Sequence, residues 1–197
     1  VGLITSSLAY GRVRQIMKSS ENVLSCLGSK PSEKLMKPIF SDLVPSSFKH
    51  RFTTSGDINA YLQGINRIMR EYGSIQNFLL ESAKIYGLNF LSLCSHLSEN
   101  LTRYQSPKSF PLMPSPKSGS ACKRLFMYMR WFIRKDNVDP GGWNMFSPSQ
   151  LIMPLDTHIH SLSLLLGLTS RKSADLQTAQ EITAALSTII PLDPVKY

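Results

Sequence analysis

Apolar residues recur every three or four positions over long stretches of this sequence, with polar residues between them. Such spacing gives an α-helix one continuous apolar face. In the amino-terminal part it predicts one long helix over residues 3–27, which ends at Gly28 because glycine is a common C-terminal stop. A proline then starts a short second helix over residues 31–36, after which Pro38 and Pro45 break the spacing into a connector.

The middle of the chain has the same helical spacing. Asp57 is expected to cap a helix over residues 57–69, because a carboxylate accepts the unpaired N–H groups of a first helical turn. Two more helices are expected after it, one that follows Gly73-Ser74 and runs to residue 86, and one over residues 88–101.

Residues 105–119 differ from the rest in composition. They are rich in proline, serine and lysine and contain the tetrapeptide Ser-Pro-Lys-Ser twice. This composition favours a solvated connector, although its lysines could also lie beside a phosphate backbone. We therefore expect a single helical domain over residues 1–197, with lobes 1–104 and 120–197 joined by this segment. Both ends look truncated, since the sequence opens without Met and stops in what reads as the first turn of another helix.

The carboxy-terminal part begins with the most regular predicted helix, over residues 121–134, whose apolar side chains gather on one side. A turn rich in proline and glycine follows, and Ser147 then starts a short helix that ends before Pro154. Further helices are expected over residues 156–168 and 174–190, and no segment alternates like a strand. The expected fold class is all-α, a compact multi-helix protein with a cleft between its lobes.

Composition narrows the class of protein. Hydrophobic residues make up 42% of the chain and charged residues 18%, which excludes a disordered or fibrous protein. The three cysteines form no Cys-x-x-Cys pair, which argues against a zinc site and favours a reducing compartment. No apolar run reaches the roughly 18 to 20 residues that span a bilayer. We expect a cytoplasmic protein with no membrane contact, no metal and no cofactor.

The chain is strongly basic: 22 Lys and Arg stand against 13 Asp and Glu, a formal net charge of +9. Between residues 103 and 135 there are basic residues and no acidic one. Such a cluster can neutralise several phosphates and release their counterions, which favours nucleic acid, and double-stranded DNA in particular, as the partner. A solvated basic face is the alternative, and no obligate protein partner is inferred. The candidate nucleic-acid contacts are Lys117, Lys123, Arg124, Arg130, Arg134, Lys135 and His158.

One of these candidate contacts has a second interpretation, and three further residues could extend the site. Arg130 lies in the apolar middle of its helix, where a buried guanidinium needs a carboxylate partner, so an internal salt bridge competes with ligand contact. Tyr10 and Arg12 interrupt the first helical face, and Trp131 could stack on an unpaired base. These three are candidate pocket residues, with ordinary helix packing as the competing explanation.

The clearest local chemical signal is the run Pro154-Leu155-Asp156-Thr157-His158, in which proline ends one segment and a carboxylate opens the next helix. Asp156 could be a catalytic carboxylate. It could equally be an N-cap, which stabilises a helix by about 1 kcal/mol.

Four stretches carry a resemblance that covers essentially the whole chain: residues 7–12, 123–131, 138–143 and 154–158. The chain resembles a bacterial protein family of unknown function that is distantly similar to the helix-hairpin-helix DNA glycosylases, nearest to the archaeal oxoguanine glycosylases. The resemblance implies a helix-hairpin-helix glycosylase-like fold, in which Asp156 matches the aspartate of a Pro-Val-Asp-Thr-His-like motif. In such enzymes that carboxylate stabilises the positive charge that develops at the sugar, or assists a nucleophile.

The sequence departs from those glycosylases in two places. The glycine-bearing Leu-Pro-Gly-x-Gly hairpin is absent, and residues 147–153 stand in its place. In this resemblance the helix position of the Schiff-base lysine corresponds to Arg130, which stays protonated and cannot form an imine. Lys123 or Lys135 could replace that lysine only through an unusual geometry.

These residues together predict a glycosylase-like DNA-binding protein that excises a damaged base by hydrolysis of the N-glycosidic bond, without a lysine-dependent lyase step. Whether it is an enzyme is left open at this point. The alternatives are a noncatalytic nucleic-acid-binding module on the same scaffold, and a protein-interaction scaffold whose basic face binds an acidic protein.

Overall fold

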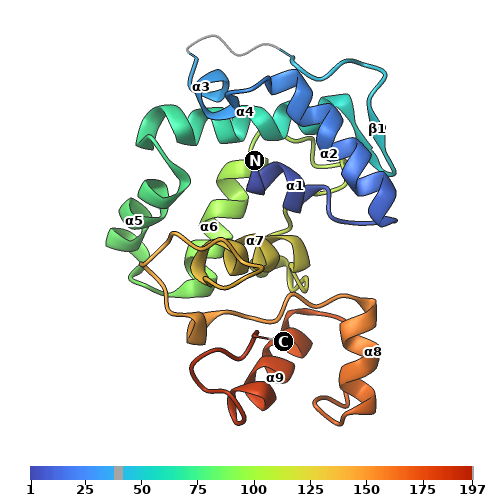
Figure 1. Cartoon of the computed structure of the whole chain (residues 1–197), viewed down its shortest axis with the longest axis vertical. Helices are drawn as coiled ribbons and strands as arrows, with labels where there is room; N and C mark the ends of the chain where they lie inside the picture. Colours follow the sequence, from blue (N-terminus) through green and yellow to red (C-terminus); the bar gives the residue numbers. More distant parts are fainter. Residues whose placement is uncertain (38–41, 197) are drawn as a thin grey trace. The chain divides into compact units, whose positions relative to one another are not determined.

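The computed structural model describes residues 1–37 and 42–196, which are mostly helical. Within these residues the elements follow in the order α1 Gly2–Ser7, α2 Val13–Leu27, α3 Pro31–Leu35, β1 Lys49–His50, β2 Thr53–Thr54, α4 Ser55–Tyr72, α5 Ile75–Tyr86, α6 Phe90–Thr102, the 3-10 turn η1 Pro116–Ser118, α7 Lys123–Ile133, the 3-10 turn η2 Pro148–Gln150, α8 Thr157–Leu165 and α9 Leu176–Ser187 (Figure 1). The expected all-α class is confirmed at this level. The expected chain break at Pro38 lies outside the described residues.

The chain divides into two compact units. Unit 1 comprises Val1–Gly87 and His96–Met113, and unit 2 comprises Leu88–Ser95 and Pro114–Tyr197. Helix α6 contributes to both, and the segment rich in proline, serine and lysine is shared between them, with the residues up to Met113 in unit 1. Each unit is described separately.

Unit 1 is organised around α4, which contacts α3, α5 and β2, while α2 lies beside α1 and β1 (Figure 1). The buried face of α4 includes Ile58, Tyr61, Leu62, Ile65 and Ile68. These are the apolar positions whose helical spacing predicted the helix, and burying them removes a continuous apolar stripe from water.

The prediction of one long first helix is wrong. The chain leaves the helical path after Ser7 and resumes it at Val13, so the stretch forms α1 and α2. Gly11 has φ +97°, a conformation that helices do not use and that glycine adopts without steric cost. The apolar spacing continues across this break, which is why it predicted an uninterrupted helix.

The start of α4 also differs from expectation. Thr54, not Asp57, is the N-cap: its hydroxyl accepts the Asp57 N–H, and the Asp57 carboxylate accepts the Thr54 N–H at 2.8 Å. This reciprocal arrangement is a capping box, in which the carboxylate stands three residues inside the helix. The two residue pairs of the antiparallel strands β1 and β2 precede it, and they are too short to give an alternating pattern.

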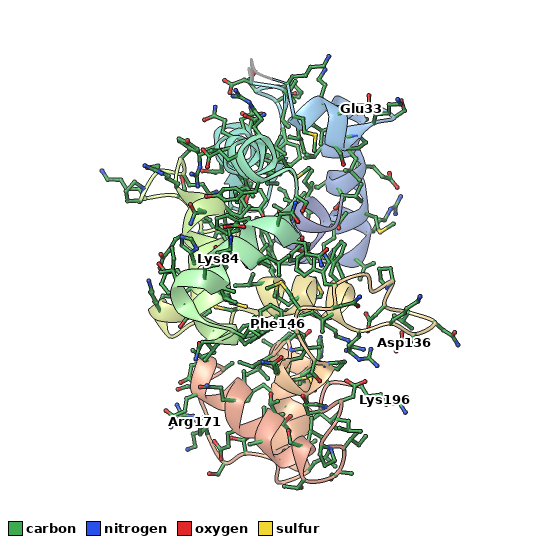
Figure 2. The ribbon with its side chains drawn as sticks, turned by 90° about the vertical axis from the view of Figure 1, so that its left-hand side faces the viewer. Glu33, Lys84, Asp136, Phe146, Arg171 and Lys196 are labelled. Carbon is green, nitrogen blue, oxygen red and sulfur yellow. The ribbon has the colours of Figure 1, made fainter. Side chains whose placement is uncertain are left out.

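Unit 2 has its core around α7. Leu125, Phe126 and Met129 of this helix are buried, and the ring centroid of Phe90 lies 6.1 Å from that of Phe126 and 5.4 Å from that of Phe146. Phe146 is labelled among the interior side chains in Figure 2. The carboxy-terminal helices α8 and α9 follow the η2 turn, and each begins at an aspartate N-cap, Asp156 and Asp175.

In the described residues no helix combines the length and the apolar character needed to cross a bilayer. Among those same residues no cluster of three or more His, Cys, Asp or Glu has the proximity to hold a metal ion.

Close packing in unit 1 gives a stability prediction for two glycines of the same helix. A Cβ added at Gly64 of α4 would collide with the carbonyl oxygen of Leu101 in α6, whereas one added at Gly56 meets nothing closer than 3.7 Å. Gly64→Ala should therefore destabilise the protein by about 1 to 3 kcal/mol, through overpacking against a backbone atom. Gly56→Ala should leave stability unchanged or raise it by up to about 1 kcal/mol, because alanine favours the helix. Urea unfolding followed by circular dichroism measures both, and equal effects would contradict the packing.

Candidate functional site

The amino-terminal ends of α7 and α8 meet at an ion pair. The ammonium nitrogen Nζ of Lys123, the first residue of α7, lies 3.1 Å from Oδ2 of Asp156. The two side chains are 35% and 30% exposed, so the pair is accessible from solvent. Asp156 and the basic helix, which the sequence singled out separately, are therefore neighbours within unit 2.

The two oxygens of the Asp156 carboxylate have different partners. Oδ1 accepts the N–H groups of His158 at 3.0 Å and Ile159 at 2.9 Å, which makes Asp156 the N-cap of α8. Oδ2 accepts from Lys123. Partial burial raises the pKa of this carboxyl, but the Ile159 N–H and the Lys123 ammonium lower it more, so its pKa is below the ordinary value. Asp156 is an anion at neutral pH.

A cavity of about 320 Å³ adjoins this ion pair, at the small end of the range for ligand pockets. It opens between α7, the turn after it and the start of α8. Its lining residues are Lys123, Met127, Arg130, Trp131, Val138, Asp139, Met153, Pro154 and Ile159. Asp156 is not among them, but Lys123, Pro154 and Ile159 are, so the carboxylate lies directly beside the hollow.

Besides Lys123, the predicted nucleic-acid contacts Arg130 and Arg134 are also engaged by carboxylates of the protein. Arg134 is only 3% exposed and pairs with Asp136 at 2.8 Å, with Asp193 at 3.0 Å and with Asp139. Arg130 donates from Nε to Asp139 at 3.1 Å and keeps 23% of its side chain exposed toward the cavity. Arg134 therefore stabilises unit 2, whereas Arg130 both pairs internally and lines the hollow.

Asp139, 1% exposed, is the centre of this cluster and was not identified from the sequence. The loop that carries it is itself fixed by Asp136, labelled in Figure 2, whose carboxylate accepts the N–H groups of Val138 and Asp139. The Asp139 N–H first, and then the Val138 N–H and the Arg134 guanidinium, lower the pKa of Asp136 to about 2. The only sequence signal was the Asp-Pro-Gly-Gly turn, which predicts a bend without showing which charges it buries.

The other predicted contacts lie in varied surroundings. Arg124 is buried on the inner side of α7, while Lys135, Lys117 and His158 are exposed. Tyr10 and Arg12 belong to unit 1, where Tyr10 is half-buried and Arg12 is exposed.

The stretch that replaces the glycine-bearing hairpin is one capped 3-10 turn, η2. Ser147 and Gln150 form its capping box, and the chain then runs extended to Asp156. No helix pair is formed over residues 147–156, so this stretch does not supply the helix-hairpin-helix element.

The sequence interpretation placed Arg130 at the lysine position and considered Lys123 as a replacement only through an unusual geometry. In the structure Lys123 is a cation in contact with Asp156. The two residues stand at the starts of helices far apart in sequence, so no local spacing relates them.

The buried thiols offer no competing nucleophile. Cys94 and Cys122 are both buried. Burial raises the pKa of Cys122 to about 12 and that of Cys94 well above its usual value. Both are therefore protonated at neutral pH, and a protonated thiol is a poor nucleophile.

Unit 2 is thus a helical scaffold that holds a cation and carboxylate pair beside a cavity. The family model described as a protein of unknown function, DUF2400, matches residues 1–197, and the chain belongs to this family. No curated protein and no solved structure matches the chain. The expected membership of a family of unknown function is confirmed, while its similarity to DNA glycosylases and its bacterial origin stay predictions.

The ion pair predicts a titration shift. In Lys123→Gln the pKa of Asp156 should rise toward its ordinary value of about 3.9, because the ammonium that stabilises the anion is gone. It should stay somewhat below that value, since the Ile159 and His158 N–H groups remain. Carboxyl-carbon NMR measures the shift. Asp175, whose pKa is lowered by the Thr178 N–H and by Arg171, is the internal control and should not move.

The lowered pKa of Asp156 also predicts how the stability of the protein changes with pH. A carboxyl whose pKa is lower in the folded state stabilises the protein above the pKa of the unfolded chain, and this contribution is lost as the pH falls through the folded value. The wild-type protein should therefore lose more stability than Lys123→Gln on acidification below about pH 4.

Neighbouring basic residues at the end of α7 give a matched pair of variants. Arg134→Gln leaves the buried Asp139 with Arg130 alone and should destabilise the protein by about 3 kcal/mol, the lower end for breaking a buried pair. Lys135→Gln changes an exposed side chain and should cost less than about 0.5 kcal/mol. Urea midpoints compare the two, and equal midpoints would contradict a stabilising role for Arg134.

Proposed function

We propose that this protein binds DNA and removes a damaged base by hydrolysis of the N-glycosidic bond, with Asp156 as the carboxylate that stabilises the developing positive charge. The supporting observation is the position of an ionised Asp156, paired with Lys123, beside a cavity in unit 2. The resemblance of residues 154–158 to the glycosylase motif points to the same carboxylate.

The chemistry needs an anion that stays ionised while the bond breaks. As the base leaves, the sugar acquires oxocarbenium character, and a fixed carboxylate nearby lowers the energy of that state. Water then adds to the anomeric carbon and gives up a proton, while the departing base gains one. The lowered pKa of Asp156 keeps it charged for this role.

The base must leave the duplex stack to reach such a site, and a flipped base needs a pocket. The cavity beside Lys123 offers apolar walls from Met127, Trp131 and Met153, with the cations of Lys123 and Arg130 at its edge. Aromatic and apolar walls suit the flat faces of a base, and cations suit the phosphates on either side of it.

Lys123 acts in this proposal as the partner that positions Asp156. An ammonium engaged by a carboxylate has no lone pair for attack, and a Schiff base requires a neutral amine. Water is therefore the nucleophile that we assign. The exposed Lys117, Lys135 and His158 are the backbone contacts that we assign in unit 2.

A noncatalytic nucleic-acid-binding module is the second candidate. The observation that favours it is that both Asp156 oxygens already have partners within the protein, Oδ1 in the helix cap and Oδ2 in the ion pair. A carboxylate used only in this way would stabilise α8 and nothing else.

The chain supplies a matched control for this question. Asp175 caps α9 with the same backbone conformation as Asp156, φ −119° and ψ −178° against −120° and −178°, and it also pairs with a cation, Arg171, at 2.7 Å. The cation that pairs with Asp156, Lys123, lines the cavity, whereas Arg171 does not. Figure 2 labels Arg171 in the carboxy-terminal part of the chain.

The test is base release from duplexes that carry a panel of damaged bases, with the full chain. Wild type should release at least one of them, and Asp156→Asn should slow release by about 10²-fold or more, the size seen when a transition-state electrostatic contact is lost. Asp175→Asn should lose about as much stability as Asp156→Asn but should release the base at the wild-type rate. A difference in rate between the two variants therefore separates catalysis from helix capping.

No release by the wild type on any lesion would reject base excision. Salt-sensitive DNA binding that persists in Asp156→Asn would then identify the noncatalytic module, and retention of a protein partner after nuclease treatment would identify the interaction scaffold. If borohydride trapped a covalent adduct on Lys123, the nucleophile would be the lysine and not water.

A further inference from the structure

A row of aromatic rings runs from the interior of unit 1 to its surface. The Tyr10 ring centroid lies 4.6 Å from that of His50 and 5.0 Å from that of Phe110, and the Phe110 centroid lies 5.6 Å from that of Phe52. His50 is fully buried, whereas Phe52 is 63% exposed. The row therefore ends in a ring that solvent can reach.

Polar contacts fix the inner end of this row. The Tyr10 hydroxyl donates to the His50 carbonyl oxygen at 3.0 Å and shares a hydrogen bond with the Thr53 hydroxyl at 2.6 Å. The two His50 ring nitrogens contact Ser19 of α2 at 2.9 Å and the Tyr10 carbonyl oxygen at 3.1 Å. These bonds hold the strands β1 and β2 and the loop between α1 and α2 in one arrangement.

The tip of the hairpin is held in an unusual backbone conformation. Arg51 has φ +52°, which is uncommon for a residue other than glycine. Its side chain passes over Gly11, where an added Cβ would lie 2.8 Å from the Arg51 Cδ, and its guanidinium carbon is 5.4 Å from the Phe52 ring centroid. Backbone strain of this kind persists only where the surrounding structure keeps it in place. It is found at ligand-binding sites.

The segments that carry the exposed ring and its neighbours are basic. Residues 10–14, 49–54 and 106–110 contain no Asp or Glu, and the Asp57 carboxylate, which contacts Thr54 and Ser109, is the acidic group at their inner side. Their basic residues are all exposed: Arg12, Arg14, Lys49, Arg51 and Lys108. This group, with Phe52, is called the Phe52 platform below.

We propose that the Phe52 platform binds single-stranded nucleic acid, with an unpaired base stacked on Phe52 and the backbone phosphates held by the surrounding cations. Nonspecific single-strand binding combines these two parts, a cationic track and an aromatic ring on which a base can stack. Arg51 contributes a planar guanidinium beside the ring, which can stack as well as bind phosphate.

The aromatic ring favours nucleic acid over the other anionic partners. An acidic protein would need only the cations, and a lipid surface would accept any large apolar side chain between them. Stacking requires a π-face, so the identity of residue 52 discriminates between these partners. The inference does not depend on base excision, because the platform lies in unit 1 and uses no residue of the Asp156 site.

The test measures binding of a fluorescently labelled oligothymidylate to the full chain by anisotropy. Phe52→Leu keeps the apolar volume but removes the ring, and it should weaken binding roughly tenfold, as loss of one stacked base does. Phe52→Trp should restore or improve binding. Tyr86→Leu is the control, since Tyr86 is a 43% exposed aromatic residue of the same unit, and it should bind as wild type does.

The cations give a second measurement on the same platform. The double variant Arg12→Gln with Arg14→Gln should reduce the slope of log Kd against log salt by about 1.4, at roughly 0.7 for each single-strand phosphate contact. Circular dichroism melting checks that every variant is folded.

Three results would overturn the proposal: no oligothymidylate binding by the wild type, equal affinity in Phe52→Leu and wild type, or a loss in Tyr86→Leu as large as in Phe52→Leu. Cosedimentation with phosphatidylserine vesicles that Phe52→Leu retains, in the absence of oligonucleotide binding, would identify a membrane surface in its place. Oligonucleotide binding and base release are measured separately, so failure here and failure of base excision are distinguishable.

Discussion

Asp156 connects the start of α8 to the start of α7, and unit 2 is arranged around that connection. One oxygen of its carboxylate satisfies the free N–H groups of α8, where the helix dipole also favours a negative charge. The other oxygen binds Lys123. Lys123 is the first residue of α7, so the pair brings the starts of the two helices together, and Lys123 also lines the cavity.

The basic charge of the protein is divided between internal and external uses. A net charge of +9 is a property of the whole chain and does not show which cations face solvent. Arg134 pairs with three carboxylates and Arg130 with one, so part of the basic cluster in the sequence is neutralised inside the protein. The Phe52 platform contributes a second group of cations, which lies in three separate segments and forms no cluster in the sequence.

The two proposals place different parts of nucleic-acid recognition in different units. The Asp156 site supplies a fixed anion beside a small hollow, the arrangement that suits chemistry on one nucleotide. The Phe52 platform supplies a ring and exposed cations, which suit binding without sequence preference. Neither needs a metal or a covalent group, so both can be tested with single substitutions that leave the fold intact.

Local sequence patterns were enough to predict five of the helices and one N-cap. Helical spacing placed α4, α5, α6, α7 and α9, and proline before Asp156 with a free first turn after it placed the N-cap of α8, because these signals depend only on residues within one or two turns. The same signals failed at residues 8–12, where apolar spacing continues through a glycine turn, and at Thr54, where capping is shared between two residues. Lys123 beside Asp156, Asp193 beside Arg134 and the aromatic row behind Phe52 join residues that are distant along the chain. Such groups come within contact distance only when the chain folds. Ionic and aromatic contacts between them produce no periodic pattern in the sequence, so the tertiary structure alone determines these sites.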